Sequence, residues 1–216
     1  GRQWEQGIYS EFISYNEVIS ALDLLSETGT SLFLAIPSKD IGDDSLKSLI
    51  KSAWFKGVEV RAWLLLPYEE GYWPNEENLI SFSSIIDRFV EWKKKEGLPV
   101  NWIIFDLETS FGTTLKINEY MSRMDIGALI ELFKGQVNPQ EYMSSKAFLR
   151  GIIKRLRLSG MRSMVVTYPF ILDDVEDGDE ALQDAFNVPV QGIEWDEVSF
   201  MVYRSMTEDM IGSDMN

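Results

Sequence analysis

Six segments with the character of β-strands alternate with amphipathic segments along this 216-residue chain. The strand-like segments are rich in β-branched and aromatic residues, and several are apolar at nearly every position. Because a parallel sheet covered by helices buries both faces of its strands, this pattern predicts an α/β fold. The expected strands are 7–13, 31–36, 58–66, 100–108, 162–168 and 197–204, and the expected helices are 17–25, 45–54, 78–95, 117–134, 144–158 and 179–186.

Six consecutive βα units are compatible with a (β/α)8 TIM-type barrel or with an open doubly wound sheet. No glycine-rich phosphate loop follows the first strand, where a nucleotide-binding sheet would carry one. Polar and aromatic residues instead gather after the expected strand ends, at 67–78, 108–112 and 168–179, where barrels build their active sites. We therefore expect a single barrel domain over 1–216. With six units visible, either the barrel is incomplete or two units are missing from this sequence.

The residue composition excludes several kinds of catalysis. The chain has no His and no Cys, so Ser-His-Asp triads, Cys-His pairs and His-based zinc sites are ruled out. Catalysis would fall to carboxylates, Tyr, Lys or Arg. We expect neither a cofactor nor a metal. The acidic run 173–180 lacks the spacing of a calcium loop, and a carboxylate-only Mg²⁺ site needs a third carboxylate that the sequence does not show.

The net charge and the hydropathy of the chain argue against nucleic acid and membranes as partners. A net charge of −15 repels phosphate backbones, so we expect no nucleic-acid partner. The longest apolar stretches are strand-sized and fall short of the roughly 20 residues that a membrane span needs. No secretory leader pattern follows Gly1, which leaves the compartment open because a trimmed secreted protein would look the same.

The segment NWIIFDLE, residues 101–108, ends in two carboxylates. Strand alternation puts Ile104, Asp106 and Glu108 on one face, at the C-terminal rim if that face points into the barrel. Repulsion and partial burial should raise the pKa of one carboxyl and leave a protonated acid beside a charged partner, as a general acid requires. The alternative is that both residues simply end the strand, cap the next helix or pair with an Arg.

This segment resembles the strand-four motif of glycoside hydrolase family 18, the chitinase-like barrels, which runs Asp-x-x-Asp-x-Asp-x-Glu. Asp106 and Glu108 match the last two acids, whereas Asn101 and Ile104 replace the first two. The family carries Met-x-Tyr-Asp on its sixth strand, and residues 201–204 read Met-Val-Tyr-Arg. Family 25 muramidases also carry an Asp-x-Glu at a strand end, so this pair alone does not choose between the two families.

The resemblance implies a glycoside hydrolase that acts on β-linked N-acetylhexosamine-containing glycans and that is secreted or periplasmic. Glu108 would protonate the glycosidic oxygen, and Asp106 would orient the substrate's 2-acetamido group for its attack on C1. Tyr203 would hydrogen-bond the same acetamido group. The replacements at Asn101, Ile104 and Arg204 favour the alternative, a catalytically inactive carbohydrate-binding barrel.

Residues near the expected strand ends complete the predicted carbohydrate site. Tyr68 and Trp73 follow the third strand, Tyr168 follows the fifth, and flat rings of this kind stack on the apolar faces of sugars. Glu11, near the end of the first strand, and Arg204, beside Tyr203, join them as expected substrate contacts. The alternative for each ring is packing within its own loop.

Overall fold

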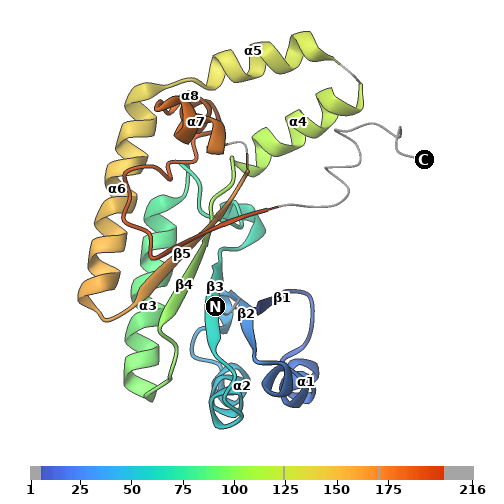
Figure 1. Ribbon diagram of the computed structural model, residues 1–216, viewed down its shortest axis with the longest axis vertical. Coiled ribbons are helices and arrows are strands. Elements are labelled where there is room, and N and C mark those ends of the chain that lie inside the picture. Colours follow the sequence, from blue (N-terminus) through green and yellow to red (C-terminus); the bar gives the residue numbers. More distant parts are fainter. Residues whose placement is uncertain (1–5, 124, 170, 202–216) are drawn as a thin grey trace.

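The computed structural model describes residues 6–123, 125–169 and 171–201 and confirms the predicted α/β class. Six parallel strands form one sheet in sequence order, so each crossover joins neighbouring strands. The sheet curls into half of a TIM-type barrel (Figure 1). Its strands are β1 (Gln6–Ser10), β2 (Thr30–Pro37), β3 (Val60–Leu65), β4 (Trp102–Asp106), β5 (Arg162–Thr167) and β6 (Glu197–Phe200).

The helices follow the predicted alternation, with differences after β4 and β5. The single helix expected over 117–134 is two helices, α4 and α5, which extend away from the sheet at the top of Figure 1. The segment expected to be a loop after the fifth strand contains a helix, α7. The helices are α1 (Tyr15–Thr28), α2 (Asp44–Phe55), α3 (Leu79–Glu96), α4 (Phe111–Ser122), α5 (Ile126–Gln136), α6 (Pro139–Leu158), α7 (Ile171–Asp177) and α8 (Ala181–Phe186), with short 3-10 turns at Ser38–Asp40 and Tyr68–Glu70.

The convex face of the sheet packs against the helices and holds most of the core. Side chains from α1, α2, α3 and α6 cover the outward-facing residues of β2 to β5, and Leu64, Ile103 and Phe105 lose all contact with solvent there. In Figure 1, α3 and α6 lie side by side to the left of β4 and β5. Burial on both faces explains why these strands are apolar at nearly every position.

The concave face has its own apolar cluster, and it identifies the inward-facing residues of each strand. Its buried members are Phe33, Ala35, Trp63, Leu65, Trp102, Ile104, Met164 and Val166. Near the N-terminal ends of the strands, the buried Arg61 lies over the rings of Trp102 and Phe33, at 4.1 and 5.1 Å from their centroids. Its guanidinium donates to Glu59 at 3.0 Å and to Glu197 at 2.7 Å.

Contacts that skip strands follow from the curl. Arg61 of β3 reaches Glu197 of β6, although β4 and β5 lie between these strands in the sheet. On the other side, the ring of Tyr9 in β1 meets the ring of Trp63 in β3 at 5.6 Å and 85°. Four of the five residues of β1 are exposed, and within the described residues no strand pairs with the outer edge of β1 or of β6.

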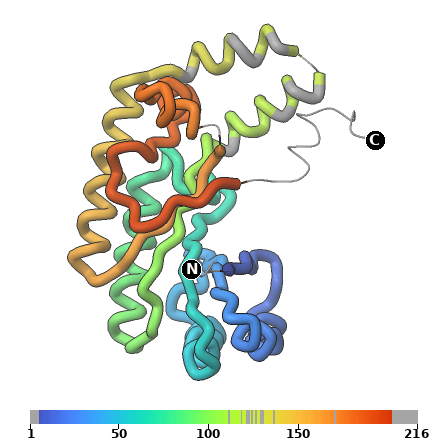
Figure 2. Tube along the Cα trace, viewed as in Figure 1, coloured from blue at the N-terminus to red at the C-terminus, as the bar shows by residue number. Residues whose placement is uncertain are grey.

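The segment after α8 returns along α6 before it enters β6 (Figure 2). Arg150 of α6 donates to the carbonyl of Gly192 at 2.8 Å, and Arg157 of the same helix bonds Glu194. Asp196 then accepts hydrogen bonds from the backbone and side chain of Ser163 in β5. Glu194 and Asp196, which precede β6, therefore link this segment to α6 and β5.

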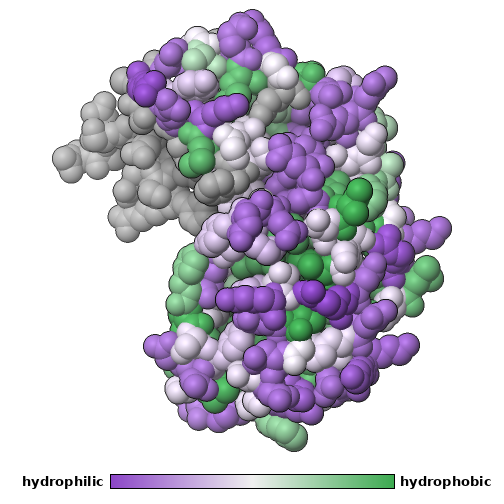
Figure 3. Space-filling view, turned by 180° about the vertical axis from the view of Figure 1, so that it is seen from behind, coloured by the Kyte–Doolittle hydropathy of each residue, from purple (hydrophilic) through white to green (hydrophobic). Residues whose placement is uncertain are grey.

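The surface on the far side of the molecule from Figure 1 is largely hydrophilic, with hydrophobic residues in small separate groups (Figure 3). None of the helices in the described part of the chain combines the length and the apolar character that a membrane crossing requires.

Candidate active site

The end of β4 carries Asp106 and Glu108 onto the concave face, as strand alternation predicted. Trp102 and Ile104 belong to the concave cluster, and the pairing with β5 continues past Asp106 through the bond from Leu107 N to Val166 O at 2.9 Å. Asp106 is only 9% exposed. The two carboxylates therefore lie at the C-terminal end of the curled sheet, on its inner side.

Tyr168, which follows β5, lies against Glu108. Its hydroxyl donates a hydrogen bond to Glu108 Oε2 at 3.0 Å. Burial and the Glu108 charge raise the pKa of Tyr168, so the phenol keeps its proton and acts as a donor. The predicted site residues Glu108 and Tyr168 are thus brought together by neighbouring strands.

Glu11, just after β1, brings a third carboxylate to the same end of the sheet. It accepts a hydrogen bond from Tyr72 Oη at 2.6 Å, and the Tyr72 ring stacks on Tyr68 with centroids 4.1 Å apart. Tyr72 has a φ of 61°, which is rare for an aromatic residue, and its turn is closed by the bond from Leu66 N to Tyr72 O at 2.8 Å. This strained turn holds the Tyr72 hydroxyl on Glu11.

Burial and neighbouring charges shift the pKa values of Asp106 and Glu108. Burial raises the pKa of Asp106 well above its usual value, and the charges of Glu108 and Glu11 raise it further. Burial also raises the pKa of Glu108, which the Tyr168 hydrogen bond opposes and the Glu11 charge reinforces. Within the described residues no Lys or Arg forms an ion pair with any of the three. The group therefore favours a protonated Asp106 beside an ionised Glu108.

Two buried polar atoms on the concave face have no hydrogen-bond partner among the described residues. One is Asp106 Oδ1, and the other is the indole Nε1 of Trp63. Trp63 pairs with Ile104 across the sheet, so it lies two residues from the register position of Asp106. Because unsatisfied buried polar atoms are rare in folded proteins, this pair indicates a place for water or a polar ligand.

The structure brings together most of the predicted site residues. Tyr68 is 59% exposed and reaches the site through its stack on Tyr72. Trp73 Nε1 donates to the Thr109 carbonyl at 3.0 Å, which ties the loop after β3 to the turn after Glu108. Tyr203 and Arg204 lie outside the described residues.

Sequence reasoning missed the roles of Tyr72 and Trp63. Tyr72 lies in the segment 67–78 after the third strand, but its link to Glu11 depends on the turn geometry. Trp63 lies on the concave face by the same alternation that places Asp106, and this signal was available from the sequence.

No group of three or more acidic residues in the described part of the chain lies close enough together to hold a metal ion. The acidic run 173–180, which lacks the spacing of a calcium loop, is partly helical. Its buried Asp174 accepts hydrogen bonds from Leu182 N and Gln183 N at the start of α8.

The fold and the inward carboxylates define an open α/β barrel with an acidic site at the C-terminal ends of its strands. No protein-family model matches the chain, and no curated protein is significantly similar in sequence. Two solved structures that resemble it are D-psicose 3-epimerases. One, determined in the presence of D-fructose, has a TM-score of 0.49 and 12% identity, with 98% of this chain and 67% of the other covered. The other, from Clostridium cellulolyticum H10 with D-tagatose, has a TM-score of 0.50 and 11% identity, with 92% and 63% covered.

The chain spans about two thirds of the length of these epimerases. At 11% identity, the similarity to the Clostridium enzyme is a similarity of fold. The predicted resemblance to glycoside hydrolase family 18 is wrong, since no family model matches and the similar solved structures are sugar epimerases. The assignment to hydrolysis of N-acetylhexosamine glycans is wrong with it. Ile104 gives the physical reason against this assignment. It is an apolar residue of the concave cluster. Family 18 carries an acid at this position, which would share hydrogen bonds with Asp106.

Proposed function

We propose that this half-barrel binds a monosaccharide-sized polyhydroxylated molecule at Asp106, Glu108 and Glu11 and exchanges a proton with it. The observation that carries the proposal is Asp106, nine-tenths buried on the concave face with an unpartnered Oδ1 and with two other carboxylates acting on it. A sugar offers closely spaced hydroxyl groups that both donate and accept, which suits a protonated carboxyl beside an ionised one.

The two carboxylates of β4 suit different steps of an acid–base reaction. Glu108, held by the Tyr168 hydroxyl, is the better base, and Asp106, more deeply buried, is the better acid. Glu108 would take a proton from the carbon next to a sugar carbonyl while Asp106 gives its proton to the carbonyl oxygen. The product is an enediol. Glu108 then returns a proton to a carbon of the enediol, and an enediol hydroxyl gives a proton back to Asp106, which restores both carboxyl groups without any oxidant.

Aromatic residues beside the carboxylates support a sugar as the ligand. The exposed ring of Tyr68, stacked on Tyr72, offers a flat apolar surface next to Glu11. The indole Nε1 of Trp63 supplies a donor that no residue in the described ranges uses. A sugar could therefore stack on a ring, accept from Trp63 and donate to an ionised carboxylate.

Binding without turnover is the second candidate. The exposure of β1 favours it, since on that side the described residues place no further strand that would exclude water from Glu11. Proton transfer from carbon benefits from a site that excludes water, whereas binding of a sugar tolerates an open one.

Calorimetric titration tests binding at this site. D-fructose and D-tagatose, the sugars named with the structurally similar epimerases, are the first probes, followed by other ketoses and aldoses. The expected result is saturable binding that weakens by about tenfold or more in Glu108→Gln, as loss of a charged hydrogen-bonding partner predicts. The exposed Glu27→Gln is the matched control and should bind as the wild type does. If no monosaccharide binds, or if Glu108→Gln binds equally well, the proposal fails.

A further inference from the structure

A cavity of about 240 Å³ lies outside the carboxylate site, between the loop after β3, the start of α4, the junction of α5 with α6 and the end of α8. Neither Asp106 nor Glu108 lines it. Its volume is far above the roughly 10–15 Å³ that a single water requires. The cavity therefore has room for a small organic molecule.

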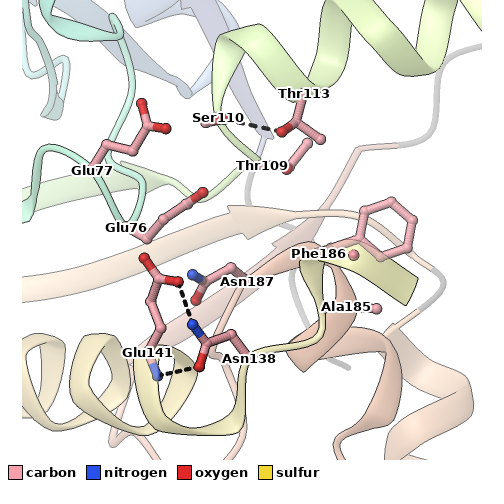
Figure 4. Close-up of a pocket in the computed structure, with 11 residues that line it drawn as sticks. Glu76, Glu77, Thr109, Ser110, Thr113, Asn138, Glu141, Ala185, Phe186 and Asn187 are labelled. Atoms are coloured by element: carbon pink, nitrogen blue, oxygen red, sulfur yellow. Dashed lines mark hydrogen bonds between the residues drawn. The ribbon is translucent and has the colours of Figure 1, made fainter. Parts of the chain in front are cut away.

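Two oxygen atoms on the wall of this cavity are buried without a hydrogen-bond partner among the described residues. They are Oε2 of Glu76 and Oδ1 of Asn187. Figure 4 shows the Glu76 carboxylate directed into the space between Asn187 on one side and Ser110 on the other. Because buried oxygen atoms without a hydrogen-bond partner are rare in folded proteins, two of them in one cavity indicate a donor-bearing ligand or ordered water.

Several other polar groups of the cavity have partners. The Glu141 carboxylate accepts from Asn138 Nδ2 at 3.0 Å, and Asn138 Oδ1 caps α6 by accepting from Glu141 N at 3.3 Å. Ser110 Oγ donates to Thr113 Oγ1 at 3.2 Å (Figure 4). Among the described residues, the buried acceptors of this wall that have no partner are Glu76 Oε2 and Asn187 Oδ1.

The backbone fixes one of these acceptors in place. Asn187 ends α8 with a φ of 49°, in the left-handed region that Asn tolerates better than other residues with a side chain. Its backbone N–H donates to Asp184 O and Gln183 O, so the C-cap geometry carries the side chain to the cavity independently of any ligand.

The charge of the wall selects the kind of ligand. Glu76, Glu77 and Glu141 line the cavity, and none of the lining residues in the described part of the chain is Lys or Arg. Anions are therefore repelled. A metal ion finds no cluster of three acidic ligands in the described residues. A primary ammonium group carries one positive charge and three donors with no acceptor, which matches two open acceptors in an acidic wall.

We propose that this cavity binds a small organic cation with a primary ammonium group, whose N–H groups donate to Glu76 Oε2 and Asn187 Oδ1. The ring of Phe186, also on the wall, can face the aliphatic part or the charge of such a ligand. This site is separate from the sugar site proposed above and stands whether or not that proposal holds.

Calorimetric titration with 1,4-diaminobutane and butylamine at pH 8 and low ionic strength tests the proposal, with the neutral 1,4-butanediol as the control ligand. Burial raises the pKa of Glu76 to about 7, and pH 8 lies above this value, so the carboxylate is mostly ionised in the experiment. The expected result is saturable binding of the amines and none of the diol. Glu76→Gln and Asn187→Gly should each weaken amine binding by about tenfold or more. The glycine keeps the left-handed backbone while it removes the side-chain oxygen.

Controls separate this result from unfolding and from general attraction to an acidic protein. Glu27→Gln, on the exposed face of α1, removes one negative charge and should bind the amines as the wild type does. Glu108→Gln should also bind them normally, even if it loses sugar binding. Near-ultraviolet circular dichroism checks that each variant is folded. The proposal is overturned if no amine saturates, if the diol binds as well as the amines, or if folded Glu76→Gln and Asn187→Gly bind normally.

Discussion

The hydroxyl of Tyr168, at the end of β5, donates to the carboxylate of Glu108, at the end of β4, over 3.0 Å. This bond favours the ionised form of Glu108, whereas burial of the same carboxyl favours the protonated form. Asp106, two residues earlier, receives no such bond on Oδ1 and is buried more deeply. The Tyr168 hydrogen bond and the deeper burial of Asp106 therefore make the ionisation of Asp106 and Glu108 different.

Tyr168→Phe removes the donor while it keeps the ring. The pKa of Glu108 should rise further, because the opposing hydrogen bond is lost and burial remains. Affinity for a bound sugar should fall by about 3- to 10-fold, the effect of one hydrogen bond. Carbon-13 NMR titration of the Glu108 carboxyl measures the change. Tyr68→Phe, which does not touch the Glu108 bond, is the control. An unchanged Glu108 pKa in Tyr168→Phe would contradict this account of the pair.

Asp106→Asn should make the protein more stable at neutral pH. The folded-state pKa of Asp106 lies well above 3.8, so the folded protein holds a proton that the unfolded chain releases. Stability from this group is therefore present below pH 3.8 and is lost as the pH rises towards the folded-state pKa. Asn mimics the protonated form and removes that loss. Urea unfolding at pH 4 and pH 8 measures the free energy of unfolding of both proteins. Asp106→Asn should exceed the wild type clearly at pH 8 and only slightly at pH 4. Destabilisation at pH 8 would show that the ionised carboxylate is held by favourable contacts.

Arg61→Met tests the closure of the concave face near the N-terminal ends of the strands. The substitution leaves Glu59 and Glu197 without their shared cation and removes the guanidinium from the Trp102 ring. We expect a loss of about 2–4 kcal/mol in the free energy of unfolding. Arg123→Met, which breaks an exposed pair with Glu119 on α4, should cost less than about 0.5 kcal/mol. Equal effects of the two substitutions in urea unfolding would contradict a structural role for Arg61.

Glu76→Gln should stabilise the protein above pH 7. Burial raises the Glu76 pKa from 4.5 to about 7, and the charges of Glu77 and Glu141 add to this. Because the folded-state pKa is the higher one, the stability contributed by Glu76 is lost as pH rises from 4.5 to about 7. Gln should recover about 2 kcal/mol at pH 8 and little at pH 4. Thermal unfolding across this range shows the difference. A pH-independent effect would mean that Glu76 does not titrate in this window.

Much of the fold follows from local sequence patterns. Apolar strands that alternate with amphipathic helices predicted the parallel sheet, and period-two alternation predicted that Asp106 faces inward beside Ile104. The boundary between α4 and α5 and the short α7 were missed. The helical pattern expected from residue 117 runs on through that boundary, and the acidic segment of α7 looks like a loop until Asp174 is seen to cap α8.

The site was harder to predict because its members meet through contacts between distant segments. Glu11 reaches the other carboxylates only because β1 and β4 belong to one curled sheet, and it is held there by Tyr72 from the loop after β3. The family resemblance was wrong because an Asp-x-Glu at a strand end meets a requirement that many barrels share. The residues around Asp106, such as the apolar Ile104, are what distinguish the reactions that such a carboxylate pair could support.

Deuterium incorporation is the most direct test of proton exchange at this site. D-fructose and D-tagatose, followed by other ketoses, are incubated with the protein in D2O, and NMR follows loss of the carbon-bound proton next to the carbonyl. The account predicts incorporation by the wild type and by Glu27→Gln, with the rate reduced about 100-fold or more in Glu108→Gln and in Asp106→Asn. Incorporation that persists in both variants, or none by the wild type with any sugar that calorimetry shows to bind, would contradict it.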